Sequence, residues 1–136
     1  MTVVDTSVLS LAFRRRAAGA SEPGPVRVLR DQMRTGHPVV LPGIVVQEIL
    51  SGVTHAAQFR RLRSLVAPFP ILLANRAHHV AAAGVSNACR AAGVAASVAD
   101  CLIAALTVAV GGELLTTDAD FRLIARHCGL RLSATP

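Results

Sequence analysis

Five acidic side chains of this 136-residue chain are the residues best suited to chemistry. They are Asp5, Glu48, Asp100, Asp118 and Asp120. Carboxylates that converge in one crevice repel one another, and some stay protonated at neutral pH unless a cation is present. Hard divalent ions such as Mg²⁺ and Mn²⁺ favour carboxylate oxygens as ligands. A site that gathers these acids is therefore expected to bind a divalent metal ion and to support hydrolysis of a phosphodiester bond.

Each acid also has an alternative, purely structural explanation. Taken singly, Asp5 and Asp118 could each be a helix N-cap. Asp120 could complement a helix dipole, and Glu48 could be an ordinary solvent-facing residue. Asp100 is harder to explain in this way, because the helical segment around it is apolar on nearly every side. A buried carboxylate is costly unless it is paired or bound to a metal. A capping interaction near Ser97 is the structural alternative for Asp100.

The acids fall near the ends of the elements that the sequence predicts. Short apolar runs predict strands at 2–5, 39–41, 71–73 and 113–116, and favour a last one at 130–132. Helical spacing and cap residues predict helices at 6–18, 25–34, 44–50, 55–66, 76–92, 97–110 and 118–127. This alternation predicts one α/β domain over residues 1–136, a three-layer α/β/α fold with a parallel sheet of four to five short strands. Ligands of such sheets bind beyond the carboxyl ends of the strands.

The composition narrows the possible functions. The formal net charge is +6, all fourteen basic residues are arginine, and 52% of the residues are hydrophobic. Such an apolar chain is not intrinsically disordered, and without lysine it cannot be a P-loop or Schiff-base enzyme. The basic balance indicates either a polyanionic partner such as nucleic acid or a simple bias in composition. Because the chain has no Trp or Tyr, recognition of RNA by aromatic stacking is nearly excluded. A zinc site is not indicated either, because His78 and His79 are adjacent and lack the spacing of zinc ligands.

We expect a cytoplasmic protein. The apolar stretch after Met1 lacks the basic segment and the cleavage pattern of a secretory signal. Three widely spaced cysteines are expected to be reduced, mostly buried thiols (Cys89, Cys101, Cys128). The segment 91–112 is long enough to cross a membrane, but its alanine and glycine content and the central Asp100 favour a buried helix. No membrane association is expected.

Four short motifs that contain the acids occur in sequence along the chain. They are Val4-Asp5-Thr6-Ser7, Val46-Gln47-Glu48-Ile49-Leu50-Ser51-Gly52, Ala99-Asp100-Cys101-Leu102-Ile103-Ala104-Ala105 and Leu115-Thr116-Thr117-Asp118-Ala119-Asp120-Phe121. Each motif is weak alone, but four in this order across a chain of this length are specific. From Met1 to about Leu132 the chain resembles the PIN-domain family, and most of all the VapC toxins of bacterial toxin–antitoxin pairs.

The resemblance implies an endoribonuclease that uses Mg²⁺ or Mn²⁺ to activate water and that cleaves structured RNA such as tRNA or rRNA. It implies catalytic roles for four acids (Asp5, Glu48, Asp100, Asp118), with Asp5, Asp100 and Asp118 binding the metal. It implies auxiliary roles for Asp120, Ser7 and Thr116. It also implies a homodimer, and a cognate VapB-like antitoxin that covers the active site.

Three questions remain open from the sequence. Arg14, Arg15 and Arg16 are candidate contacts for RNA phosphates, but a solvated run of charge explains them equally well. A catalytically inactive PIN-like module that binds RNA or protein is one alternative function. A phosphoacceptor or phosphatase with Asp118 and Asp120 as its acid pair is another. Such chemistry usually needs a lysine and an acid pair on the first strand, and the chain has neither.

Overall fold

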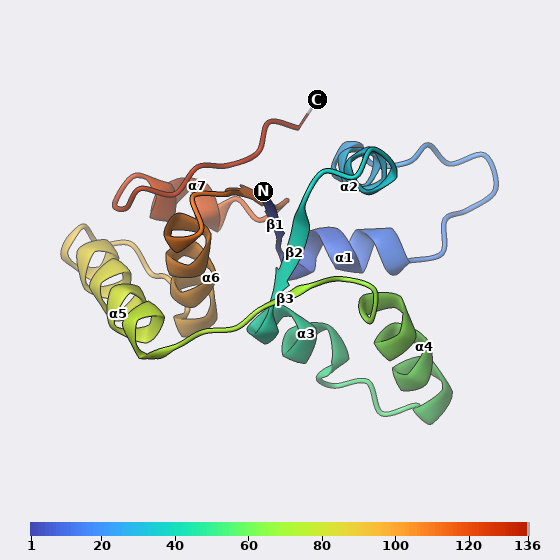
Figure 1. Ribbon diagram of the computed structural model, residues 1–136, viewed down its shortest axis with the longest axis horizontal. Coiled ribbons are helices and arrows are strands. Elements are labelled where there is room, and N and C mark those ends of the chain that lie inside the picture. The colour runs from blue at the N-terminus through green and yellow to red at the C-terminus, as the bar shows by residue number, and fades with distance from the viewer. Residues whose placement is uncertain (136) are drawn as a thin grey trace.

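The computed structural model describes residues 1–135 as an alternation of short strands and helices (Figure 1). The strands are β1 (Thr2–Val4), β2 (Val39–Pro42), β3 (Ile71–Leu72) and β4 (Glu113–Leu115). The helices are α1 (Thr6–Phe13), α2 (Gly24–Arg34), α3 (Gly43–Leu50), α4 (Ala56–Val66), α5 (Arg76–Ala91), α6 (Val98–Ala109) and α7 (Asp120–Ala125). All seven predicted helices and four of the predicted strands are present. The strand favoured at 130–132 is reduced to a single bridge between Leu114 and Leu132.

The strands form one parallel sheet in the order β3-β2-β1-β4. β1 is an inner strand, and its residues Val3 and Val4 are completely buried. Strands that are covered on both faces consist of continuous apolar residues, which is why these short runs form strands. The register pairs Val4 of β1 with Leu115 of β4. The residues that follow these two strands therefore emerge side by side.

Helices cover both faces of the sheet, as the sequence predicts (Figure 1). On one side α5 and α6 pack against each other, and α6 also contacts α7. On the other side α1 contacts α2 and α3. Large buried side chains from both layers and from the sheet fill the space between them, among them Leu9, Leu41, Ile103 and Phe121. The expected three-layer α/β/α architecture is confirmed.

Several helix boundaries differ from the sequence prediction, and two of the differences have a clear local cause. α1 ends at Phe13 rather than near residue 18, because Arg14 takes an extended conformation (φ −73°, ψ 137°) and the next two residues are also arginines with nothing apolar to bury. α7 begins at Asp120 rather than at Asp118. The Asp118 carboxylate accepts a hydrogen bond from the Asp120 N–H (2.9 Å), and this local turn competes with helix formation.

The apolar segment 91–112 contains a loop followed by α6, which is twelve residues long. Within residues 1–135, no helix combines the length and the apolar character that crossing a bilayer requires. All three cysteines are free: Cys89 and Cys101 are buried, and Cys128 is half-buried. Burial raises the pKa of the Cys89 and Cys101 thiols, which keeps both in the protonated form.

Gly112 fills a position at the start of β4 where a side chain would not fit. A Cβ atom there would lie 2.9 Å from the Met1 carbonyl oxygen, which also accepts a hydrogen bond from the Glu113 N–H. We expect Gly112→Ala to lower the free energy of unfolding by about 1–3 kcal/mol, because β4 must shift away from β1. Urea denaturation measures the change.

Gly84→Ala is the matched control, since a Cβ in that part of α5 meets no atom within 4 Å. The control is expected to be neutral or slightly stabilising, and equal destabilisation of both variants would contradict this explanation.

Candidate active site

Asp5 is held in place by hydroxyl groups from two segments. It is 4% exposed, and it caps α1 by accepting a hydrogen bond from the Ser7 N–H. Its Oδ2 atom also accepts hydrogen bonds from the Ser7 hydroxyl (2.7 Å) and the Thr116 hydroxyl (2.8 Å). Since Val4 pairs with Leu115, Asp5 and Thr116 each follow a paired residue and meet beyond the ends of their strands. The parallel register thus explains why these two residues are in contact.

The same two hydroxyls fix the turn after β4. The Ser7 Oγ atom accepts a hydrogen bond from the Thr117 N–H (3.0 Å), and the Thr116 Oγ1 atom accepts one from the Asp118 N–H (3.0 Å). Each hydroxyl therefore donates to Asp5 and accepts from the turn. This arrangement links the conformation of the turn, and hence the position of Asp118, to Asp5.

Asp100, Asp118 and Asp120 form the tightest group of acids. Each offers one carboxylate oxygen such that the three oxygens lie within 4.8 Å of one another. Asp100 is positioned by the start of α6, where its N–H donates to the Ser97 hydroxyl (3.0 Å). The capping interaction that the sequence offers as an alternative is thus present, and it leaves the Asp100 carboxylate directed towards the other acids.

The environment of Asp100 raises the pKa of its carboxyl from 3.8 to about 6. Desolvation is the main cause, and repulsion by Asp118, Asp5 and Glu48 adds to it, while a hydrogen bond with Ser97 acts in the opposite direction. The repulsion shows that these carboxylates share one electrostatic environment. All five acids identified from the sequence are therefore gathered at the carboxyl ends of β1 and β4 and the adjoining helices.

Glu48 extends from α3 to the exposed rim of this group. Its Oε1 atom accepts a hydrogen bond from the Thr6 hydroxyl (3.0 Å), which joins α3 to the first residue of α1. Sequence reasoning did not identify Thr6 as part of the site. The hydrogen bond joins residues that are 42 positions apart in the sequence. The one feature of the sequence that could have indicated a role for Thr6 is its position next to Asp5.

Two features of the geometry bear on the roles predicted for these residues. The compact oxygen group contains Asp120 with Asp100 and Asp118, whereas the Oδ2 atom of Asp5 is bound by the two hydroxyls. The basic run at 14–16 follows the far end of α1, about 12 Å of helix away from Asp5. Arg16 there lies 3.8 Å from Glu22, so its guanidinium contacts an acid outside the site.

The chemistry of the acid group suits Mg²⁺ or Mn²⁺. The three donors are all carboxylate oxygens, which such ions prefer. Two oxygens bound to one Mg²⁺ lie up to about 4.2 Å apart, because each metal–oxygen distance is about 2.1 Å. A small inward movement of the three side chains would therefore allow them to share one ion.

The fold and this group of acids together define a known class. The family model described as the PIN domain matches residues 2–127, and the chain belongs to this family. The chain is 35% identical over 136 residues to the VapC ribonuclease Mb1587 of Mycobacterium bovis and to ribonuclease VapC11 of Mycobacterium tuberculosis, and the similarity covers 98% of each chain.

Solved structures with the same fold extend the comparison. FitAcB from Neisseria gonorrhoeae superposes with a TM-score of 0.76 at 19% identity, covering 98% of this chain and 97% of that one. VapBC2 from Rickettsia felis, solved with a DNA fragment from its promoter, gives a TM-score of 0.78 at 15% identity, covering 99% and 98%. At these identities the likeness establishes the fold.

Proposed function

We propose that the protein is a divalent-metal-dependent endoribonuclease. The observation that carries the proposal is the convergence of five acids, from four separate parts of the chain, at one end of the sheet. Two relatives are 35% identical over nearly the whole chain, and both are named as ribonucleases. Their names support the same activity. The reaction is hydrolysis of an RNA phosphodiester bond by water.

The acids have different roles in this proposal. Asp100, Asp118 and Asp120 would hold the ion. When bound, a divalent ion neutralises charge on the phosphate and makes water a better nucleophile. Asp5 would bind the ion through Oδ1, and it also has a positioning role, because the hydrogen bonds that its Oδ2 atom accepts from Ser7 and Thr116 hold the turn that carries Asp118. Glu48 receives a proton from the attacking water at Oε2, since its Oε1 atom is bound by Thr6.

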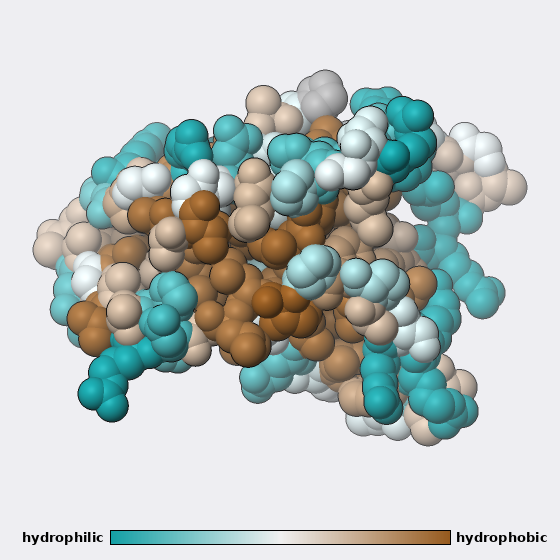
Figure 2. All heavy atoms as spheres, viewed as in Figure 1, coloured by the Kyte–Doolittle hydropathy of each residue, from teal (hydrophilic) through white to brown (hydrophobic). Residues whose placement is uncertain are grey.

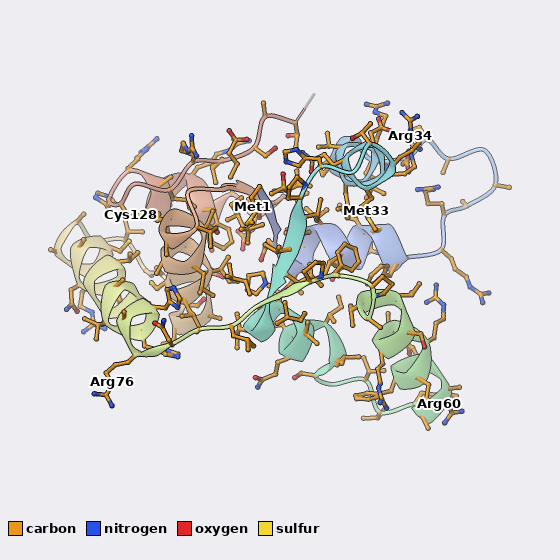
Figure 3. All side chains as sticks on the ribbon, viewed as in Figure 1. Met1, Met33, Arg34, Arg60, Arg76 and Cys128 are labelled. Atoms are coloured by element: carbon orange, nitrogen blue, oxygen red, sulfur yellow. The ribbon has the colours of Figure 1, made fainter. Side chains whose placement is uncertain are left out.

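The charge distribution suits an RNA substrate. Five of the eight acidic residues lie in the site, which leaves three acids among fourteen arginines over the rest of the chain. Arginine side chains project outwards from separate helices, for example Arg34, Arg60 and Arg76 in Figure 3. Such a surface attracts the phosphate backbone of a folded RNA without reading its sequence. We propose structured RNA, such as tRNA or rRNA, as the substrate class.

The test is cleavage of total tRNA by the purified protein with Mg²⁺, with Mn²⁺ and with EDTA. We expect fragments of defined length with either metal and none with EDTA. Asp118→Asn should cleave at least about 100-fold more slowly, because it removes a carboxylate from the group of three. Cleavage that persists in EDTA would contradict the metal requirement. RNA binding without cleavage under any condition would indicate an inactive binding module.

The titration of Asp100 gives a second test of the acid group. In metal-free protein we expect its carboxyl to titrate near pH 6. Asp118→Asn should lower this pKa, because it removes the largest charge repulsion on Asp100. Addition of Mg²⁺ near that pH should release protons, since the ion binds the ionised form. Carboxyl chemical shifts in ¹³C NMR measure both effects. An Asp100 pKa that is the same in the wild type and in Asp118→Asn would contradict the arrangement described above.

We also propose that the protein has a VapB-like antitoxin partner and forms a homodimer. One solved structure with this fold, from Klebsiella pneumoniae, is described as a toxin–antitoxin complex, with a TM-score of 0.66 and 19% identity. Figure 2 shows apolar side chains gathered on one face. Val98, Leu73 and Val80 are 87%, 74% and 67% exposed, as expected of a surface that another chain covers. Light scattering of the protein alone tests for the homodimer. Light scattering after co-expression with the product of an adjacent small gene tests for the complex with the antitoxin.

A further inference from the structure

A cavity of about 340 Å³ opens beside Asp118 and lies outside the group of acids. Its walls come from four parts of the chain. Pro25 of α2 and Arg122 of α7 line it, together with Thr117 and Asp118 of the turn after β4 and with Ser133 and Thr135 near the end of the chain. Its volume falls within the range of about 300–1,000 Å³ that is usual for small-ligand sites. The cavity therefore adjoins the proposed site of hydrolysis and is large enough for part of a substrate.

The end of the chain reaches the cavity because it runs along β4. The Leu114 N–H donates to the Arg131 carbonyl (2.9 Å), and the Ser133 N–H donates to the Leu114 carbonyl (2.8 Å). Leu114 and Leu132 form a parallel bridge. A segment that runs parallel to β4 ends at the same edge of the sheet as β4 does. This pairing places Ser133 and Thr135 beside Asp118.

The groups that line the cavity complement a ribonucleotide. Within residues 1–135, Arg122 forms no salt bridge and is therefore available to a phosphate. In the same part of the chain the hydroxyls of Thr117, Ser133 and Thr135 make no hydrogen bond, unlike that of Thr116, which is bound to Asp5 and to the turn. A small inorganic anion would be repelled by Asp118. A nucleotide offers a phosphate to Arg122 and also sugar hydroxyls to the polar groups.

We propose that this cavity binds one ribonucleotide of the RNA substrate next to the cleaved bond. Arg122 contacts its phosphate, and the hydroxyls of Ser133 and Thr135 contact its ribose. The 2′-hydroxyl is the group that allows a protein to distinguish RNA from DNA at such a position. The cavity thus contributes substrate affinity and a preference for RNA, and it leaves the chemical step to the acids. This inference rests on the proposed ribonuclease function, because it assigns a contact to the substrate of that site.

The first test compares two arginines of the same region. Arg122→Gln should weaken binding of a labelled single-stranded oligoribonucleotide at least about tenfold, as expected for a charge-assisted contact. The slope of log affinity against log salt concentration should fall by about 0.7, the value for one phosphate contact on a single strand. Arg126→Gln is the matched control, since Arg126 follows α7, is also exposed and does not line the cavity. Fluorescence anisotropy in EDTA measures binding without cleavage.

The second test concerns the ribose. Ser133→Ala combined with Thr135→Val should weaken RNA binding severalfold and leave binding of DNA of the same sequence unchanged. In the cleavage assay both cavity variants should raise KM, with kcat and Mg²⁺ affinity unchanged. Circular dichroism confirms that each variant is folded before it is measured.

The outcomes separate this inference from the proposed function. If Arg122→Gln binds RNA as tightly as Arg126→Gln, or if the hydroxyl variant loses RNA and DNA binding equally, the proposal for the cavity is wrong even when the wild type cleaves RNA. If the wild type cleaves no RNA with Mg²⁺ or Mn²⁺, the proposed function fails. The anisotropy measurement in EDTA still decides whether the cavity binds a ribonucleotide.

Discussion

Replacing Asp100 with asparagine should slow RNA cleavage at least about 100-fold and should also make the metal-free protein more stable at neutral pH. The loss of activity follows because Asp100 supplies one of the three clustered carboxylate oxygens. The gain in stability follows because this carboxylate is half-buried and is repelled by Asp118, Asp5 and Glu48. A change that removes activity and adds stability is typical of a site where like charges are held together for function.

The sign of the stability effect depends on the direction of the pKa shift. The pKa of Asp100 is raised from 3.8 to about 6 on folding, so the folded state binds this proton more tightly than the unfolded state. The contribution of Asp100 to stability is therefore present below 3.8 and is lost as the pH rises through about 6. Asparagine carries no charge and does not undergo this loss. The variant should exceed the wild type in stability at neutral pH, and the difference should shrink under acidic conditions.

Urea unfolding of both proteins in EDTA, at neutral pH and under acidic conditions, measures this difference in stability. Asp31→Asn is the matched control, because Asp31 is a half-exposed acid of α2 that pairs with Arg30 (3.1 Å) outside the site. The control should leave RNA cleavage unchanged and should not stabilise the protein. An Asp100→Asn protein that is less stable than the wild type at neutral pH would show that repulsion is not the dominant interaction of Asp100.

Asp5→Ala should lower the free energy of unfolding by about 2–3 kcal/mol, the largest stability loss expected for a single acid of the site. The substitution removes the N-cap of α1 and leaves the Ser7 and Thr116 hydroxyls without their acceptor. It should also reduce cleavage strongly, because those hydroxyls hold the turn that carries Asp118. Chemical denaturation and the tRNA assay measure the two effects.

Asp5→Asn separates the two roles of this residue. An asparagine still offers an oxygen acceptor at the cap, so it should retain more than half of the stability that alanine loses. If Asp5 acts mainly by positioning the turn, cleavage by the asparagine variant should recover partly in the same way. Equal loss of cleavage in both variants, with stability restored only in Asp5→Asn, would instead assign Asp5 a direct contact with the metal or the substrate.

The sequence predicted the convergence of the acids because that convergence depends only on the order of strands and helices. Asp5 follows one buried strand and Asp118 follows another, and the carboxyl ends of parallel strands meet at one edge. That Asp120 would lie among the three acids closest to one another was not predicted, since it depends on the hydrogen bond that holds Asp120 in a turn against Asp118. Such local competition between a side chain and the backbone is not visible in a periodic pattern.

Other features could not be predicted because they join distant parts of the chain. The Thr6–Glu48 hydrogen bond depends on how α1 packs on α3, and no local pattern encodes that packing. The cavity beside Asp118 depends on the last residues running along β4, where a weak strand signal produced only one bridge. The end of α1 was misplaced because helical spacing continues into a run of arginines that has no core to pack against.

The pairing of β1 with β4 has a consequence for the timing of activity. Asp5 is synthesised well before its Thr116 partner, which lies 111 positions later. Chains are synthesised from the N-terminus at about 5–20 residues per second, so the centre of the sheet waits several seconds for its last strand. Until then β1 lacks one neighbour, and the acids of the fourth motif are absent. Under the proposed function, a nascent chain therefore cannot hydrolyse the RNAs that surround it until β4 and the acids that follow it have been made.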